Sequence, residues 1–358
     1  MYGERLSKLR KKLDDGNLDG MIISKPENLF YMSGFTGGEG VIIITRQVAS
    51  LVTDFRYAEQ AADQAPDYNI IELEPGVSPF KACAEILESA GAQKVGFESH
   101  HLTVKAFEEL KQHLKAVQPE ITDGMVEKLR VVKEECEIDM IKKAQEITDE
   151  AFGHILNYIK PGVSEKDLAC ELEYFVKKRG AEEMAFDTIV ASGPRSSLPH
   201  GRASDRRLEA GDFVTVDFGA RFSCYCSDMT RTVFLGKPDR DQLNIYNTVL
   251  EAQKKALSYI KPGIFGKDVD RIARDVIKER GFGENFGHAL GHSVGIEIHE
   301  EPRLSSKSET KLEPGMVVTV EPGIYISGFG GVRIEDLVVI TGDGCEDLTK
   351  ASKDIICI

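Results

Sequence analysis

The sequence predicts a mixed α/β (α+β) protein of two domains, in which the second domain is built from an internal repeat. Three observations support this prediction. The chain has 358 residues, which is more than one ordinary hydrophobic core organises. Helical and strand patterns alternate in the first third of the chain, which is typical of an α/β domain. In the second half, three sequence motifs recur in the same order.

The first domain is expected to span residues 1–128. Some of its segments have apolar residues at helical spacing, and others are short runs of β-prone residues. We expect helices at 4–14, 54–64, 80–91 and 101–115, and strands at 20–24, 40–45, 48–54, 69–74 and 94–98. The glycines at 37, 38 and 40 lack the spacing of a dinucleotide-binding loop, so we interpret them as a plain turn.

A polar, helix-rich stretch at 126–147 joins the two halves of the chain. Its apolar residues recur roughly with a helical period; they are Val126, Leu129, Val132, Ile138 and Ile141. We expect the domain boundary between 125 and 133, and we assign residues 129–358 to the second domain.

The second domain contains the internal repeat. YIKPGVSEKDL at 158–168 recurs as YIKPGIFGKDV at 259–269, and GDFVTVDFG at 211–219 recurs as GMVVTVEPG at 315–323. KRG at 178–180 matches ERG at 279–281, and each ends a predicted helix with glycine just after the C-cap. Each repeat is therefore predicted to be a helix, a Lys-Pro-Gly turn, a second helix and a β-hairpin. We expect a pseudo-twofold axis to relate the two repeats.

Four acidic residues and one histidine interrupt apolar or β-prone runs of this domain. They are Asp217, Asp228, His292, Glu321 and Glu335. A buried charge is costly unless it is paired or bound to a metal, and clustered carboxylates repel one another. Two divalent cations would neutralise the four acids. We therefore predict that the five residues are the ligands of a two-metal hydrolytic site.

The repeat and the strand period explain how these ligands can converge. Asp217 lies on a predicted strand, and Asp228 lies on its hairpin partner, so both side chains can point at one ion. The matched segments place Glu321 at the position of Asp217, and Glu335 at the position of Asp228. Oxygen ligands with one imidazole favour Mn²⁺ or Co²⁺, and Fe²⁺ or Zn²⁺ is also compatible. Two such ions can activate water for hydrolysis.

The composition argues against several classes of partner. The formal charge of −14 argues against nucleic acid or an anionic membrane. The N-terminus MYGERLSKLRKKL has no apolar segment typical of a signal peptide, and the longest apolar runs are too short to span a membrane. The seven cysteines have no spacing typical of a disulfide framework. We expect a cytoplasmic protein with reduced thiols.

The five ligand motifs resemble, in identity, order and spacing, those of the "pita-bread" metallopeptidases, specifically the proline-specific branch that contains aminopeptidase P and prolidase. The N-terminal segment TDFRYAEQA is similar to the creatinase-type domain of that branch. The resemblance covers the whole chain. It implies a pita-bread catalytic domain, proline-containing peptides as substrates and a homodimer. One departure is GHSVG at 291–295, where the family often has GHGIG.

The resemblance also implies roles for the metal ligands and for two further histidines. Asp217 and Glu335 would share the metals, Asp228 would bind one ion and His292 the other. Glu321 would be both a ligand and the general base. The catalytic histidines implied are His200, near the scissile bond, and His299, near the tetrahedral intermediate or the leaving group.

Four more residues correspond to substrate-handling positions of the family. His288 would line the substrate pocket, and Tyr325 and Arg333 would order the metal ligands. Arg303 resembles the arginine with which some prolidases clamp the C-terminal carboxylate of a dipeptide, and a bidentate pair of this kind would enforce short substrates. Related aminopeptidases can carry a similar stretch, so Arg303 does not decide the substrate length.

The sequence leaves the exact peptidase activity open. An X–Pro bond has no N–H, so a proton donor must reach the ring nitrogen of the leaving proline. We favour an Xaa-Pro aminopeptidase, with an Xaa-Pro dipeptidase as the alternative. A non-catalytic peptide-binding module or a creatinase-like amidinohydrolase is a weaker alternative, because such proteins typically lose metal ligands. The N-terminal domain argues against a methionine aminopeptidase.

Overall fold

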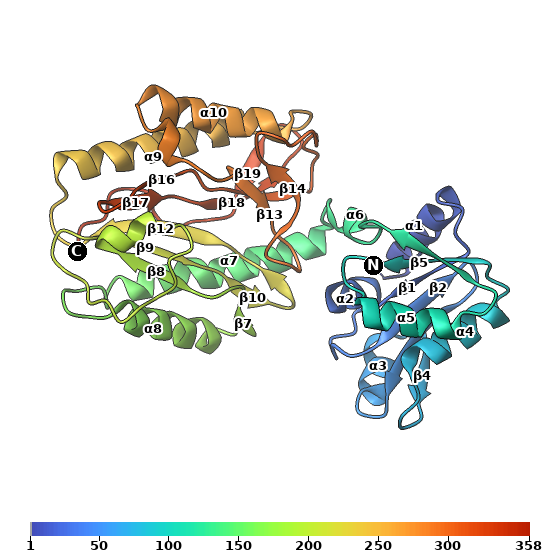
Figure 1. Cartoon of the computed structure of the whole chain (residues 1–358). Coiled ribbons are helices and arrows are strands. Elements are labelled where there is room, and N and C mark those ends of the chain that lie inside the picture. Colours follow the sequence, from blue (N-terminus) through green and yellow to red (C-terminus); the bar gives the residue numbers. More distant parts are fainter. Residues whose placement is uncertain (1) are drawn as a thin grey trace. The chain divides into compact units, whose positions relative to one another are not determined.

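The computed structural model describes residues 2–358 and divides the chain into two compact units (Figure 1). The first unit ends at Arg130, and the second comprises Val131–Ile358. No helix in this described range is both long and apolar enough to cross a membrane.

A six-stranded mixed sheet organises the N-terminal unit, with the strand order β4-β3-β2-β1-β5-β6. The β1–β2 and β2–β3 pairs are antiparallel, and the other neighbours are parallel. The strands are β1 (Gly20–Ile23), β2 (Val41–Thr45), β3 (Ala49–Asp54), β4 (Asn69–Leu73), β5 (Lys94–Glu98) and β6 (Gln118–Thr122). Every predicted strand of this unit is confirmed, and β6 is an additional one.

The helices of this unit begin and end where local chemistry allows. They are α1 (Tyr2–Asp15), α2 (Pro26–Ser33), α3 (Ala58–Gln64), α4 (Pro79–Ser89), α5 (Val104–His113) and α6 (Glu127–Arg130). The predicted helices are confirmed, but two of them start later than expected. Asp54 ends β3 instead of starting α3, and α5 starts after Thr103, whose side chain accepts a hydrogen bond from the Ala106 amide at 3.2 Å. The short helix α2 was not predicted, whereas α6 and the first part of α7 (Glu135–Ile155) lie within the stretch at 126–147 that was predicted to be rich in helix.

The second unit contains two successive copies of one arrangement. The first repeat comprises α7 (Glu135–Ile155), α8 (Glu165–Lys178), β7 (Glu183–Met184), β8 (Ile189–Ser192), η1 (Gly193–Ser197), β9 (Phe213–Phe218), β10 (Ala220–Phe222), β11 (Tyr225–Cys226) and β12 (Met229–Phe234). The second comprises α9 (Arg240–Tyr259), α10 (Gly266–Glu279), η2 (Gly283–Asn285), β13 (Gly291–Ser293), β14 (Glu300–Leu304), β15 (Val317–Val320), β16 (Gly323–Ile326), β17 (Gly330–Arg333), β18 (Asp336–Ile340) and β19 (Cys345–Asp347).

The predicted repeat is confirmed down to individual hydrogen bonds. Gly162 and Gly263, from the two Lys-Pro-Gly turns, have φ angles of 88° and 86°, which favour glycine. The Gly162 amide donates to the Leu208 carbonyl at 2.8 Å, and the Gly263 amide donates to the Leu312 carbonyl at 2.8 Å. The two copies therefore have the same local fold, as the sequence matches predicted.

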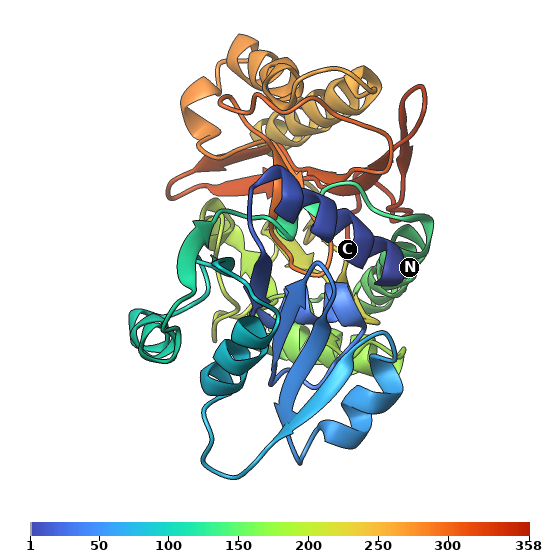
Figure 2. The ribbon, with the colours of Figure 1, turned by 90° about the vertical axis from the view of Figure 1, so that its right-hand side faces the viewer.

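Each pair of long helices covers strands of its own repeat. Buried side chains of α7 and α8 form one core with those of β9 and β12, and side chains of α9 and α10 form another with those of β15 and β18. Figure 1 shows α7 and α8 on one side of the strands and α9 and α10 on the opposite side. In Figure 2, turned by 90°, α9 and α10 again lie beyond the strands of the second repeat. The strands between the two layers carry the predicted site.

Candidate active site

The predicted metal ligands lie at the ends of paired strands in the second unit. Asp217 lies in β9, and Asp228 directly precedes β12, its antiparallel partner. Glu321 directly follows β15, and Glu335 directly precedes β18, which again are antiparallel partners. His292 lies in β13, which pairs with β15. Both hairpins and the adjacent strand thus direct their polar residues to one region.

Three of these side chains approach one another closely enough to share a metal ion. The donor atoms of Asp228, His292 and Glu335 all lie within 4.8 Å of one another, and all three residues are buried. Among residues 2–358, no other group of three such side chains meets this distance. His292 Nε2 also lies 3.4 Å from Glu321 Oε1 and 3.6 Å from Asp228 Oδ2.

Asp217 joins the group through an arginine. Arg333 donates a hydrogen bond from a terminal nitrogen to Asp217 Oδ2 at 2.5 Å. Asp217 Oδ1 is buried and has no hydrogen-bond partner among the described residues. An acceptor buried without a partner is costly, so this oxygen is suited to a ligand that the protein itself does not supply.

The electrostatics of the cluster are those of crowded, buried carboxylates. Burial and then repulsion by neighbouring acids raise the pKa of Asp228 and of Glu335 well above the usual range. Burial raises the pKa of Glu321 to about 8. Ionising these groups together is unfavourable, and divalent cations would remove that cost.

The imidazole of His292 has the state that metal binding requires. Burial lowers its pKa to about 3, so it is neutral at neutral pH. Its Nδ1–H donates to the Ser293 carbonyl at 3.2 Å, which leaves the lone pair of Nε2 facing Asp228 and Glu321. A ligating histidine typically donates its other N–H in this way. The donor set, the orphaned oxygen of Asp217 and this tautomer together fit a divalent metal site.

Arg333, Tyr325 and His288 form a chain of hydrogen bonds beside the cluster. Burial lowers the pKa of His288 to about 4, so the ring is neutral, and its Nδ1–H donates to the Ala289 carbonyl at 2.8 Å. His288 Nε2 therefore accepts from the Tyr325 hydroxyl at 3.0 Å. The Tyr325 oxygen in turn accepts from Arg333 at 2.8 Å. This chain fixes the direction of the arginine that holds Asp217.

One cavity of about 640 Å³ collects almost all of the predicted residues. Every predicted site residue except Tyr325 lines it, and Tyr325 contacts two lining residues. The rings of His292 and His299 meet edge to face with centroids 4.4 Å apart. Burial lowers the pKa of His299, with Arg303 and His200 adding to the effect. His200 also lines the cavity, although it comes from the first repeat.

Several residues of the site were not predicted from the sequence. Thr230 donates to Glu335 Oε2 at 2.7 Å and accepts from Arg333 at 2.9 Å. Thr319 donates to Glu321 Oε1 at 3.2 Å and accepts from the His292 amide at 3.0 Å. Other lining residues were also missed: Phe186, Asp187, Ile189, Pro199, Arg202 and Ile298. Alternation along the strands could have identified Thr319, which lies two residues before Glu321.

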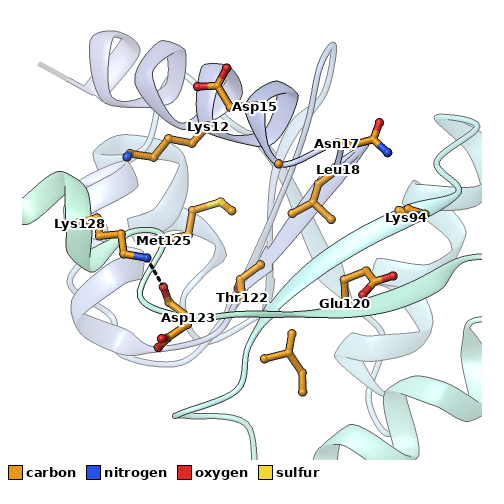
Figure 3. Close-up of a pocket in the computed structure, with 12 residues that line it drawn as sticks. Lys12, Asp15, Asn17, Leu18, Lys94, Glu120, Thr122, Asp123, Met125 and Lys128 are labelled. Carbon is orange, nitrogen blue, oxygen red and sulfur yellow. Dashed lines mark hydrogen bonds between the residues drawn. The ribbon is translucent and has the colours of Figure 1, made fainter.

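A second hollow, in the N-terminal unit, has a different character. Its volume is about 620 Å³, and it is lined by Lys12, Asp15, Gly16, Asn17, Leu18, Lys94, Glu120, Ile121, Thr122, Asp123, Met125 and Lys128. Figure 3 shows lysines and acids spread around it, with Lys128 donating to the Asp123 carbonyl at 2.9 Å. Its charges are of mixed sign and are dispersed, so the hollow has no concentrated set of ligand atoms.

The fold and the site of the second unit define a class of protein. A duplicated scaffold presents four carboxylates and a neutral imidazole to one cavity that also contains further histidines and arginines. This combination is that of a metal-dependent hydrolase.

Comparison with known proteins identifies the family. Residues 139–342 match metallopeptidase family M24, and residues 5–132 match the creatinase/prolidase N-terminal domain. The chain belongs to metallopeptidase family M24, in its Xaa-Pro peptidase branch, and is an enzyme of the peptidase type. Members of this family use divalent metal ions, and the predicted creatinase-type and pita-bread domains are confirmed.

Three relatives cover nearly the whole chain. The Xaa-Pro dipeptidase of Pyrococcus furiosus is 43% identical over 355 residues, covering 99% of each chain. The structure of an Xaa-Pro dipeptidase from Bacillus anthracis is 46% identical with a TM-score of 0.98, covering 100% of both chains. The structure of an X-Pro aminopeptidase from Thermotoga maritima is 39% identical with a TM-score of 0.90, covering 96% of this chain and 98% of the other.

Proposed function

We propose that this protein is an Xaa-Pro dipeptidase. The observation that carries the proposal is the place of Arg303. This residue pairs in register with His292 across β13 and β14, and it lines the same cavity. In an Xaa-Pro dipeptide the C-terminal carboxylate lies one residue beyond the scissile bond, so a guanidinium beside the metal ligands is suited to bind it.

The proposal reverses the preference drawn from sequence. From the sequence we favoured an aminopeptidase, because related aminopeptidases can share the stretch around Arg303. Relatives from two Pyrococcus species and a close structural neighbour carry the name Xaa-Pro dipeptidase or prolidase, which favours the alternative. The aminopeptidase remains the second candidate, because the Thermotoga maritima relative carries that name.

The assignment of ligands and ions belongs to the same proposal. We assign Asp228, His292, Glu335, Asp217 and Glu321 to two divalent ions, with Mn²⁺ or Co²⁺ preferred and Fe²⁺ or Zn²⁺ compatible. When bound, such ions supply Lewis acidity to the scissile carbonyl and activate water. The homodimer and the cytoplasmic location stay predictions.

Side chains of the cavity are assigned to proton transfer and to substrate binding. Glu321, 3.4 Å from His292 Nε2, is assigned as the base that receives a proton from the attacking water. His299 and His200 hold the scissile region by hydrogen bonds, since both line the cavity. The leaving proline nitrogen has no N–H, so the proton must be returned to it, and Glu321 is the group placed to do so.

A series of substrate lengths tests the proposal. Purified protein reconstituted with Mn²⁺ or Co²⁺ is offered Xaa-Pro, Xaa-Pro-Yaa and Xaa-Pro-Yaa-Zaa, and kcat/KM is measured for each. We expect turnover to be largely confined to the dipeptide. Comparable kcat/KM for the longer peptides would instead support the aminopeptidase.

Substitution of Arg303 tests the observation on which the proposal rests. Arg303→Ala should lower kcat/KM for the dipeptide on the order of 10- to 100-fold, mainly through KM, because a charge-assisted hydrogen bond contributes about 1.5–3 kcal/mol. Arg46→Ala is the control, because Arg46 is an exposed arginine of the N-terminal unit that pairs with Asp14. Equal KM values for wild type and Arg303→Ala would exclude the clamp.

A further inference from the structure

A buried lysine near the site has no role in the proposed hydrolysis. Lys133 lies just before α7, and its side chain is 1% exposed. Its Nζ donates to Ser293 Oγ at 2.8 Å and to Glu300 Oε2 at 3.2 Å. The Glu300 side chain is 6% exposed. A lysine is almost never fully buried unless it is paired, so this arrangement calls for an explanation.

The two partners of Lys133 are the two ends of one loop. Ser293 ends β13, Glu300 begins β14, and these residues pair in register. The loop between them contains His299, and Ser293, at its start, is the residue next to His292. The regular pairing of β13 and β14 is interrupted between His292 and Ser293, so the strand ladder alone does not set the position of this loop.

Ser293 connects the lysine directly to the metal-ligand histidine. The Ser293 carbonyl accepts the Nδ1–H of His292, and this bond sets the tautomer that leaves Nε2 facing the acids. The Ser293 hydroxyl accepts from Lys133. A glycine at this position, which the family often has, would provide the carbonyl but not the hydroxyl. Through its hydroxyl, the serine therefore allows Lys133 to hydrogen-bond to the residue that orients His292.

Glu300 connects the lysine to the other end of the loop. Its Oε1 accepts the amide of Glu297 at 3.1 Å, so the carboxylate also holds the turn that precedes His299. The rings of His292 and His299 are in edge-to-face contact, with centroids 4.4 Å apart. A shift at either end of the loop would change this contact.

We propose that Lys133 is a positioning residue that, through Ser293 and Glu300, fixes His292 and His299 relative to the carboxylate cluster. The inference rests on the proposed metal site and deepens it. Groups that orient a ligating histidine typically change metal affinity by about 10- to 100-fold when they are lost. Lys133 thus acts on the metal through Ser293 and does not itself reach the reacting atoms.

The test measures Co²⁺ binding by metal-free protein, without peptide. Isothermal titration gives the affinity, and the visible absorption of bound Co²⁺ reports the ligand geometry. We expect Ser293→Ala, which keeps the Lys133–Glu300 ion pair, to weaken the binding of one ion by about 10-fold and to change the spectrum. We expect the double variant Lys133→Met/Glu300→Gln, which removes both charges of this ion pair, to weaken it by up to about 100-fold.

A control separates positioning from general loss of stability. Leu172→Ala truncates a buried side chain in the core of the first repeat, away from the Lys133 contacts, and should bind Co²⁺ as wild type does. Wild-type affinity and spectrum in both Lys133-network variants would overturn the inference while leaving the metal site intact. An equal loss in Leu172→Ala would also overturn it. Wild-type protein that binds no Co²⁺ would overturn the proposed metal site and this inference with it.

Discussion

The two repeats of the second unit share a scaffold but differ in what they contribute to the site. In each repeat a strand lies antiparallel beside the ligand-bearing strand: Ser192 of β8 pairs with Val214, and Ser293 of β13 pairs with Val318. By this register Ala191 occupies the position that His292 has in the second repeat. The second repeat therefore offers an imidazole where the first has an alanine, and this one difference makes the proposed ligand set asymmetric.

The two equivalent serines are held by buried charges of opposite sign. In the first repeat the Glu165 carboxylate accepts from the amide of Ser192 at 2.8 Å and from its hydroxyl at 2.7 Å. In the second repeat Lys133 donates to the Ser293 hydroxyl. Each charge also holds the loop that contains a histidine of the cavity. In the two repeats, equivalent loops are thus fixed by a carboxylate in one case and by an ammonium group in the other.

The largest expected effect is on kcat and comes from replacing His292, the residue that distinguishes the second repeat from the first. His292→Ala would give the second repeat the side chain that the first has at Ala191. We expect kcat on an Xaa-Pro dipeptide to fall by about three orders of magnitude or more, because metal-ion catalysis supplies several kcal/mol of transition-state stabilisation. Circular dichroism should show a folded protein.

Metal removal provides the matched comparison for this variant. Chelation of the wild type should cause a similar loss of kcat, and added Mn²⁺ or Co²⁺ should restore it, since the carboxylates need cations. The same addition should not restore His292→Ala. Full activity of His292→Ala with either ion would contradict the assignment of this residue as a ligand.

A second, smaller effect concerns the buried acid of the first repeat. Glu165 is fully buried and accepts hydrogen bonds from Ser192, Ser204 and Arg195. Glu165→Ala should lower the free energy of unfolding by about 3–5 kcal/mol, because it removes the carboxylate partner of Arg195 and of the Ser192 and Ser204 amides. Urea unfolding measures this loss.

The control for this change is an exposed acid on α7. Glu146 pairs with Lys143 at the surface, so Glu146→Ala should change the free energy of unfolding by no more than about 0.5 kcal/mol. If Glu165→Ala were equally mild, the acid would not be holding the His200 loop, and the comparison with Lys133 would fail.

The parts of the structure that could be predicted from the sequence are those with a regular residue pattern or a duplicated motif. Strand alternation and the duplicated motifs located the hairpins of the second unit and the strands β1 to β5 of the first. Strand β6 escaped prediction because Gln118–Thr122 is largely accessible and contains Pro119, which strands usually avoid. The eight-residue α2 gives too short a pattern to show helical periodicity.

The residues that support the site were harder to predict than its proposed metal ligands. A carboxylate inside an apolar strand is conspicuous, whereas Lys133 lies in a stretch rich in lysine and glutamate and looks like a solvated residue. Its burial depends on Ser293 and Glu300, which are far away in the sequence. Thr230 resembles any strand threonine until its contacts with Glu335 and Arg333 are seen. Such partners are set by tertiary contacts and have no local signal.

The smallest expected effect is on stability and concerns strand β19. In the second repeat β18 is followed by β19, whereas in the first repeat β12 is followed, after a short link, by helix α9. Burial, and then repulsion by Asp336, raise the pKa of Asp347 in β19 to about 6 from the usual 3.8. The folded state therefore binds a proton more tightly than the unfolded state, and stability falls as pH rises from about 4 to about 6.

Asp347→Asn should raise the free energy of unfolding at pH 7 by about 1 kcal/mol, after allowance for solvent screening, and should have no such benefit at pH 4. Urea unfolding at both pH values measures the difference. A loss of stability at pH 7 would mean that the ion pair of Asp347 with Lys353, at 3.1 Å, outweighs the cost of burial, and that β19 is held by attraction between charges.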